Sequence, residues 1–125
     1  MSSQYHEPPE ELAAKTRDLT RVLVSLKEEV EAIDWYNQRI ELSTDPQVAK
    51  ILKHNQEEEM EHACMALEYL RRNMDGWDEA LRTYLFTEGD ITELEEIAMG
   101  RNGASGAARS AGTGSLGIGN LKGVE

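Results

Sequence analysis

The chain has 125 residues and a formal net charge of −11, from 24 acidic and 13 basic side chains. This length allows one small domain, and the acidic balance argues against binding to nucleic acid or to anionic membranes. The same balance favours cations as ligands. The single cysteine, Cys64, excludes an intrachain disulfide and fits a reducing compartment.

The sequence has no features of an exported or membrane-spanning protein. Its first residues, MSSQYHEPPEE, include no apolar segment of the secretory type, and no run of about 18 apolar residues occurs. We therefore expect a cytoplasmic protein without membrane contact.

Two long helices are predicted in the first three quarters of the chain. Residues 9–42 are rich in Leu, Glu, Ala, Lys and Arg, which predicts one long helix. A short STDP segment then interrupts the pattern. Pro46 suits the first turn of a second helix, with Thr44 or Asp45 as its cap. The second helix is expected to run to about Met74, where Asp-Gly follows.

The rest of the chain predicts a third, shorter helix and then a tail. Residues 77–86 place apolar side chains at helical spacing on one face, and residues 92–98 are expected to add a turn or two. From 99 to 114 nearly every residue is small or polar, which predicts a flexible linker. We expect an all-α domain over residues 1–98, followed by the linker and a separate segment at 115–125.

A loop of about three residues forces the two long helices to run antiparallel. Positions spaced alternately by three and four residues predict the faces that meet. These positions are Val22, Leu26, Glu29, Ile33, Tyr36 and Ile40 on the first helix, and Val48, Leu52, Asn55, Glu59, His62 and Ala66 on the second. A turn centred on Thr44 then places Glu29 opposite Glu59, with His62 at the same level.

This arrangement matches half of a known kind of metal centre. Two carboxylates that face each other inside a helical core raise each other's pKa unless a cation is present. Ferritin-like di-iron sites take one Glu from each of two helices and Glu-x-x-His from each of two others. Glu29, with Glu59 and His62 as Glu-x-x-His, supplies half of that set, so a two-fold pair of chains completes it. Such ligands suit iron or manganese, and zinc could compete.

The pattern alone leaves simpler interpretations open. Glu59 and His62 also fit a surface glutamate and an ordinary helical histidine, and Tyr36 fits either a hydrogen-bonding partner near the site or plain core. Glu28, Glu31 and Asp34 are most simply a solvated face, although carboxylates beside a metal site could also guide cations in. Glu57, Glu58 and Glu61 fall outside the faces that meet. His54 and Glu58 are spaced to share a secondary cation, but plain surface is the simpler interpretation. We assign Cys64 no ligand role.

Four segments make the sequence resemble the encapsulated ferritins, ferritin-like cargo proteins of bacterial and archaeal encapsulin compartments. They are EEVEAIDWYNQR at 28–39, HNQEEEMEHACM at 54–65, LRTYLFTEGDIT at 81–92 and SLGIGNLKG at 115–123. The resemblance covers nearly the whole chain. It implies a two-helix hairpin with a short C-terminal helix, subunit pairs that build a ferroxidase centre at their interface, and an annular decamer.

The resemblance also implies roles for particular residues. The centre's ligands fall on Glu29, Glu59 and His62, and a nearby tyrosine falls on Tyr36. The family's further cation positions fall on two groups of residues: an outer uptake site at Glu28 and Glu31, with Trp35 beside it, and secondary surface sites at His54, Glu58 and Glu61.

The implied activity is oxidation of Fe²⁺ to Fe³⁺ with O₂ at two irons per pair of chains, with the mineral stored inside the encapsulin shell. Leu116, Ile118 and Leu121 are then a targeting peptide whose side chains fill pockets on the inner wall of the shell.

Two other functions remain open at this point. A non-catalytic metal-binding protein would hold iron, manganese or zinc without consuming oxygen. A purely structural helical cargo protein would show no metal dependence, and Glu29→Ala would be neutral or stabilising because it removes a buried charge.

Overall fold

The computed structural model describes residues 4–97 and 99, and these form helices without any strand. The elements in chain order are η1 (Pro9–Glu11), α1 (Ala14–Leu42), α2 (Pro46–Asn73), α3 (Trp77–Tyr84) and η2 (Ile91–Glu93). Residues 94–97 continue as helix after η2, as expected for this stretch. The chain divides into two compact units, Met1–Asp78 and Glu79–Glu125. No helix in the described part is long and apolar enough to span a membrane.

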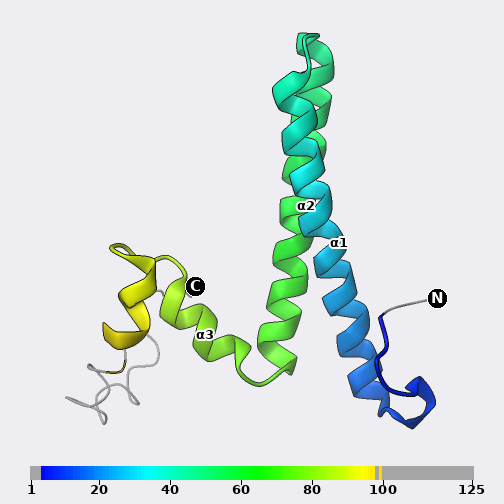
Figure 1. The fold of residues 1–125 in the computed structure, drawn as a ribbon, viewed down its shortest axis with the longest axis vertical. Helices are drawn as coiled ribbons and strands as arrows, with labels where there is room; N and C mark the ends of the chain where they lie inside the picture. The colour runs from blue at the N-terminus through cyan, green and yellow to red at the C-terminus, as the bar shows by residue number, and fades with distance from the viewer. Residues whose placement is uncertain (1–3, 98, 100–125) are drawn as a thin grey trace. The chain divides into compact units, whose positions relative to one another are not determined.

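The first unit is a hairpin in which α1 and α2 run antiparallel and pack against each other (Figure 1). Residues 43–45 join the two helices, so the predicted short loop is confirmed. The cap of α2 is Asp45 and not Thr44, because its carboxylate accepts hydrogen bonds from the backbone N–H groups of Gln47 at 2.9 Å and Val48 at 3.4 Å. Pro46 follows as the first helical residue, where its missing N–H leaves no bond unmade.

The predicted start of the first long helix at residue 9 is wrong, because α1 begins only at Ala14. The segment before it forms the separate turn η1. Leu12 and Ala13 both have an extended backbone, with ψ angles of 144° and 155°, and this separates η1 from α1. Arg17 stabilises this break, since its Nη1 donates to the carbonyl oxygens of Pro9 at 2.9 Å and Leu12 at 2.7 Å.

The buried positions of α2 differ by one residue from those predicted. Gln56, Ala63 and Leu70 are the buried residues of this helix, spaced by seven. Asn55 and His62, which the spacing placed at the centre, lie half-buried and exposed at its margin. The prediction failed because glutamine and alanine give no apolar signal, whereas both fit here: Ala63 is small, and Gln56 has a hydrogen-bond partner on α1.

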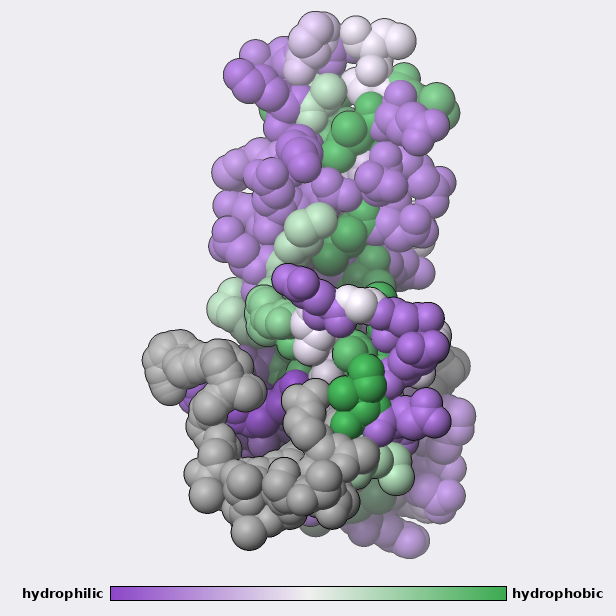
Figure 2. Space-filling view, turned by 90° about the vertical axis from the view of Figure 1, so that its left-hand side faces the viewer, coloured by the Kyte–Doolittle hydropathy of each residue, from purple (hydrophilic) through white to green (hydrophobic). Residues whose placement is uncertain are grey.

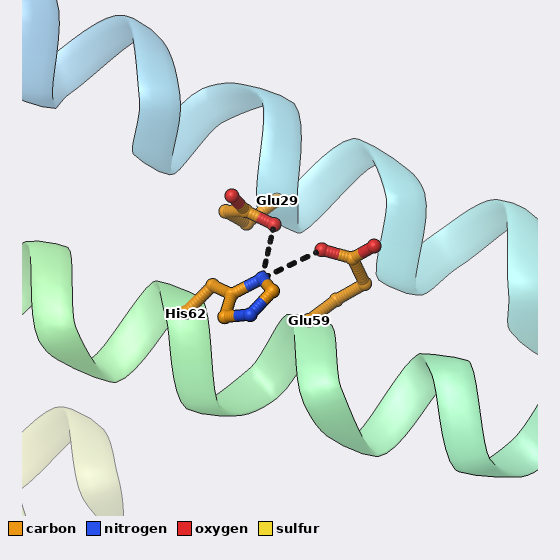
Figure 3. A group of neighbouring side chains, drawn as sticks. All are labelled: Glu29, Glu59 and His62. Atoms are coloured by element: carbon orange, nitrogen blue, oxygen red, sulfur yellow. Dashed lines mark hydrogen bonds and ion pairs between the residues drawn. The ribbon is translucent and has the colours of Figure 1, made fainter.

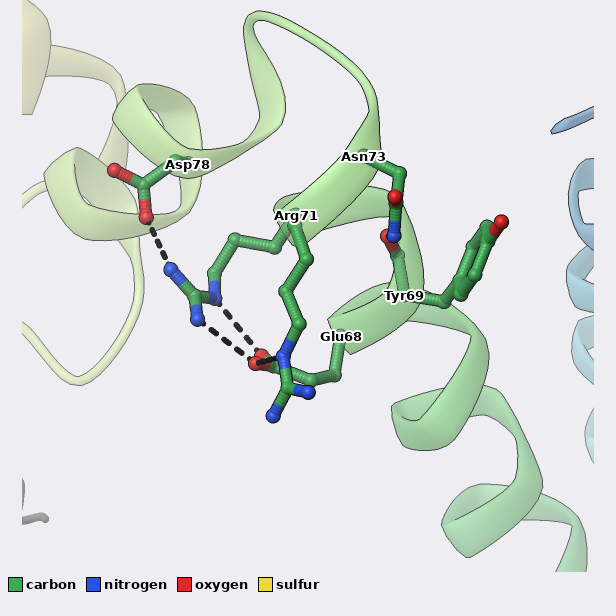
Figure 4. A network of polar contacts seen from close by, with 6 residues as sticks. Glu68, Tyr69, Arg71, Asn73 and Asp78 are labelled. Atoms are coloured by element: carbon green, nitrogen blue, oxygen red, sulfur yellow. Dashed lines mark hydrogen bonds and ion pairs between the residues drawn. The ribbon is translucent and has the colours of Figure 1, made fainter. Parts of the chain in front are cut away.

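Charged side chains form a hydrogen-bonded group at the C-terminal end of α2 (Figure 4). Gly76 takes a φ of 101°, which suits glycine. The Arg71 guanidinium donates to Glu68 at 2.8 Å and to Asp78 at 2.6 Å, and Arg72 donates to the same glutamate at 2.6 Å. The residues of these contacts, up to Asp78, all belong to the first unit.

Helix α2 ends at Asn73, next to the predicted end at Met74, whereas α3 ends at Tyr84. That is two residues before the predicted end, because Phe86 adopts a φ of 59° outside the helical region. The predicted linker and targeting segment, with Leu116, Ile118 and Leu121, lie outside the described residues apart from Met99.

The hairpin leaves much of its apolar surface uncovered. Figure 2 shows apolar surface running along the hairpin between hydrophilic flanks. In the described part of the chain, the buried apolar residues are Ala63, Leu70 and Leu94. By contrast, the hairpin exposes a longer series of large apolar side chains, including Val30, Trp35, Val48, Ile51, Met60, Met65 and Tyr69. A core this small is typical of chains that bury further surface in an oligomer.

Candidate metal centre

Three predicted ligand residues meet between the two helices of the hairpin. Glu29 comes from α1, and Glu59 and His62 come from successive turns of α2 (Figure 3). The Nδ1 atom of His62 lies 3.3 Å from Oε1 of Glu59 and 3.5 Å from Oε1 of Glu29. One ligand atom from each residue lies within 4.8 Å of the others. Their side chains therefore converge on one volume that could hold a cation.

The cluster is neither buried nor fully solvated. The side chains of Glu29 and Glu59 are each 24% exposed, whereas that of His62 is 45% exposed. The two glutamates are therefore partly desolvated between the helices, while the imidazole leaves one side of the cluster open. That opening allows ligands from outside the chain to reach the same volume.

The pKa values of the three clustered side chains are shifted because two carboxylates lie close together. A hydrogen bond with Glu59, followed by burial and the Glu59 charge, raises the pKa of Glu29 above its usual value. The same hydrogen bond lowers the pKa of Glu59, and His62 adds to that effect. The hydrogen bond to Glu59 also raises the pKa of His62. In the absence of a cation, a proton on Glu29 relieves the repulsion between the two carboxylates. A bound cation would have the same effect.

The residues predicted around this centre remain apart from it in a single chain. Tyr36 is half-buried on α1, two turns from Glu29, and the guanidinium of Arg39 stacks over its ring at 5.3 Å. Glu28, Glu31 and Trp35 are exposed on α1. Within the described structure, no side-chain hydrogen bond or ion pair joins these predicted residues to the three clustered residues.

The predicted secondary positions do not form a ligand cluster by themselves. His54 Nε2 lies 3.2 Å from Glu58 Oε2 at the expected one-turn spacing, and Glu61 is exposed. Over residues 4–97 and 99, the group of Glu29, Glu59 and His62 is the one set of three or more side chains placed to hold a metal. Cys64 is exposed and lies outside that set.

Sequence reasoning missed one residue next to the centre. Gln56 is buried, and its Nε2 donates to the backbone carbonyl oxygen of Ile33 at 3.2 Å, from one helix to the other. Its seven-residue spacing to Ala63 and Leu70 was the available signal, but only if glutamine is allowed a core position.

The helical hairpin with its glutamate and histidine cluster defines a ferritin-like, all-α protein. The family model described as EncFtn-like matches residues 4–88, and the chain belongs to that family. The match includes the whole hairpin, α3 and all three clustered residues.

Individual relatives agree with this assignment. The chain is 54% identical to an encapsulated ferritin-like protein of Rhodospirillum rubrum over 126 aligned positions, which cover 98% of this chain and 90% of the relative. It is 63% identical over 100 positions to a ferritin-like protein of Thermotoga maritima, covering 80% and 88%. A crystal structure of a Nitrosomonas europaea protein matches with a TM-score of 0.67 and 48% identity, over 70% of this chain and 96% of that one.

Proposed function

We propose that this protein is a ferroxidase, which oxidises Fe²⁺ to Fe³⁺ with O₂ at a di-iron centre formed between two subunits. The observation that carries the proposal is the convergence of Glu29, Glu59 and His62 on one open volume. Carboxylate oxygen and imidazole nitrogen together suit iron, with manganese and zinc as competitors. The relatives named as ferritin-like support iron as the metal handled.

The proposed centre needs a second copy of the chain. One chain offers two carboxylates and one imidazole, which is too few for two metal ions with several ligands each. A two-fold axis on the open side brings the same three residues of the partner to this volume. The four carboxylates then balance two divalent ions, in the pattern of ferritin-like di-iron sites. We propose that such pairs assemble further into a decameric ring.

The remaining predicted residues receive supporting roles in this proposal. Exposed Glu28 and Glu31, with Trp35 beside them, attract Fe²⁺ toward the centre, because carboxylates raise the local concentration of cations. His54, Glu58 and Glu61 hold cations weakly at the surface. Tyr36 is assigned a place near the reacting ions. Each Fe²⁺ gives up one electron, and O₂ is the electron acceptor.

The proposed location is the interior of an encapsulin shell in the cytoplasm. The printed name of the Rhodospirillum rubrum relative, an encapsulated ferritin-like protein, supports it. The segment with Leu116, Ile118 and Leu121 is proposed to bind the inner wall of the shell, which retains the oxidised iron as mineral. The linker before that segment supplies the reach.

The function is tested on the full-length protein by native mass spectrometry without oxygen, with and without Fe²⁺, followed by admission of air. We expect even-numbered oligomers with two irons per pair of chains, and oxygen consumption when air enters. Iron binding without oxygen consumption would show that the protein binds metal but is not a ferroxidase. Absence of bound iron at every oligomeric state would refute the proposed centre.

Three substitutions test the ligands. Glu29→Gln, Glu59→Gln and His62→Ala each remove a metal-binding atom, so each should lower the rate of oxygen consumption by at least about 100-fold. Glu57→Gln is the matched control, because Glu57 is an exposed glutamate on the same helix. If one of the three variants consumes oxygen as fast as Glu57→Gln, the residue changed in that variant does not bind the metal.

The targeting segment is tested by co-expression with an encapsulin shell protein. Replacing Leu116, Ile118 and Leu121 together by Asp should abolish co-purification, because charged side chains do not fill apolar pockets. Oxygen consumption by the isolated variant should equal that of the wild type. Retention of the variant inside shells would show that another surface is recognised.

A further inference from the structure

Gln56 is the one buried polar side chain in the described part of the chain, with 5% of its surface exposed. It lies in the middle of α2 and points at α1. Its Nε2 atom lies 3.2 Å from the carbonyl oxygen of Ile33, which is 23 residues earlier in the sequence. A backbone carbonyl only accepts hydrogen bonds, so the amide nitrogen is the group that must face it. The contact is therefore a hydrogen bond from one helix to the backbone of the other.

Stability alone gives no reason for this residue. The net contribution of a hydrogen bond to stability is small once the desolvation of its two partners is included. A methionine of similar length, or a leucine, would gain a comparable amount at this position by burying apolar surface. The best-documented role of a buried polar residue between helices is to fix the alignment of one helix along the other.

The bridge lies next to the metal cluster on both helices. Ile33 is one turn beyond Glu29 on α1, and Gln56 is one turn before Glu59 on α2. The loop at 43–45 also restricts the alignment of the helices, but about three turns away. A slip of one residue moves a side chain by about 1.5 Å along the axis and turns it by about 100°. The side chains of a metal site must be positioned to within about 0.5 Å. A hydrogen bond that fixes the alignment of the helices at this level therefore affects the geometry of the site directly.

We propose that Gln56 is a positioning residue of the metal centre. Its bond to the Ile33 carbonyl aligns α1 with α2 so that Glu29 faces Glu59 and His62. The inference rests on the proposed function, because it assigns a purpose to the alignment of those three ligands. Gln56 itself binds no metal in this account and acts through the two helix backbones.

The test separates alignment from stability in the full-length protein. Gln56→Met keeps the length and removes the donor, and Gln56→Leu is a second variant with the same purpose. Asn55→Met is the matched control, since it makes the same kind of change at the neighbouring, half-buried position. Urea unfolding of the metal-free protein measures stability. Calorimetric titration with Co²⁺, together with the visible absorption of the bound ion, measures affinity and ligand geometry.

We expect Gln56→Met to unfold at the same or a higher urea concentration than the wild type. Its affinity for Co²⁺ should fall roughly tenfold, the range for residues that orient ligands, with altered visible absorption bands. Asn55→Met should keep wild-type affinity and absorption.

Two results would overturn the inference and leave the proposed function intact. One is wild-type affinity and absorption in both Gln56 variants. The other is a fall in affinity that parallels a fall in stability and appears equally in Asn55→Met, because that reflects packing. Absence of Co²⁺ binding by the wild type would overturn the proposed function, and this inference with it.

Discussion

At the scale of single residues, Glu68 carries the most strongly shifted carboxyl group of the hairpin. Hydrogen bonds from Arg71 and then Arg72 lower its pKa from 4.5 to about 2. The folded state therefore holds this carboxylate ionised at pH values where the unfolded chain is already protonated. Its contribution to the free energy of unfolding is complete above about pH 4.5 and is lost as the pH falls toward about 2.

Glu68→Gln should make the hairpin less stable at neutral pH and less sensitive to acid. The expected loss is under about 1 kcal/mol, because the side chain is 42% exposed and solvent screens its charge. Urea unfolding of wild type and variant, compared from neutral pH down to pH 2, measures both effects. The difference between them should shrink as the pH falls.

Glu57→Gln serves as the control for acid stability. Glu57 is an exposed glutamate of the same helix with one lysine partner, Lys53, at 3.5 Å. Its variant should follow the wild type at every pH within error. An equal loss in both variants would assign the effect to the overall charge and not to the pairing with Arg71.

At the scale of helices, the start of α2 is determined by Asp45. The side chain accepts from two backbone N–H groups that have no partner within the helix. Asp45→Ala should lower the free energy of unfolding by about 1 kcal/mol, measured as a lower urea midpoint with an unchanged slope.

Asp45→Asn separates capping from charge, since asparagine caps helices about as well as aspartate. We expect it to keep most of the stability of the wild type. If Asn destabilises as much as Ala, the negative charge near the helix N-terminus is the main contribution, and the capping geometry is secondary.

The helix boundaries show what local sequence can predict. Pro46 and Gly76 have strong backbone preferences, so the ends of α2 followed from them. The choice between Thr44 and Asp45 as cap did not, because both side chains can accept the same hydrogen bonds. The start of α1 was missed because the sequence around Ala13 has good helix formers but no cap, and the bonds of Arg17 to Pro9 and Leu12 could not be foreseen.

The cluster of Glu29, Glu59 and His62 was predictable for a different reason. A short loop and antiparallel helices determine which residues share a level, so Glu29, Glu59 and His62 were expected to meet. Their rotation about the helix axes was not determined, because α2 carries polar residues on nearly every face. The structure therefore places Gln56 at the centre of the interface and His62 at its open margin.

At the scale of the whole molecule, uncovered apolar surface lies beside the candidate centre. Val30 and Met60 are exposed, and each is the immediate neighbour of a clustered glutamate. Under the proposed pairing, both side chains become buried against the partner. Under that proposal, the pairing that completes the ligand set also covers these two apolar side chains.

Replacing Val30 and Met60 together by Asn should weaken pairing while leaving the hairpin helical. A two-fold pair loses four half-exposed apolar side chains, so the loss is at least about 3 kcal/mol of apolar burial, which corresponds to roughly 150-fold weaker association. Native mass spectrometry over a dilution series measures the fraction of pairs, and circular dichroism measures the helix content. Oxygen consumption should fall in proportion to the pairs.

Leu42→Asn is the control for this change. Leu42 is also an exposed apolar residue of α1, but it lies at the loop end of the hairpin. It should leave pairing unchanged at every dilution. Pairs that persist in the double variant would place the partner on another face of the hairpin.

Under the proposed pairing, the three-residue loop makes folding of the hairpin and the onset of iron oxidation two separate steps in time. Because it joins α1 directly to α2, their contacts form without the closure of a long loop, so the hairpin folds quickly and within one chain. Pairing requires the encounter of two chains, and its rate falls with dilution. Helix content should therefore recover at once after refolding, whereas iron oxidation should follow after a lag that lengthens as the protein is diluted.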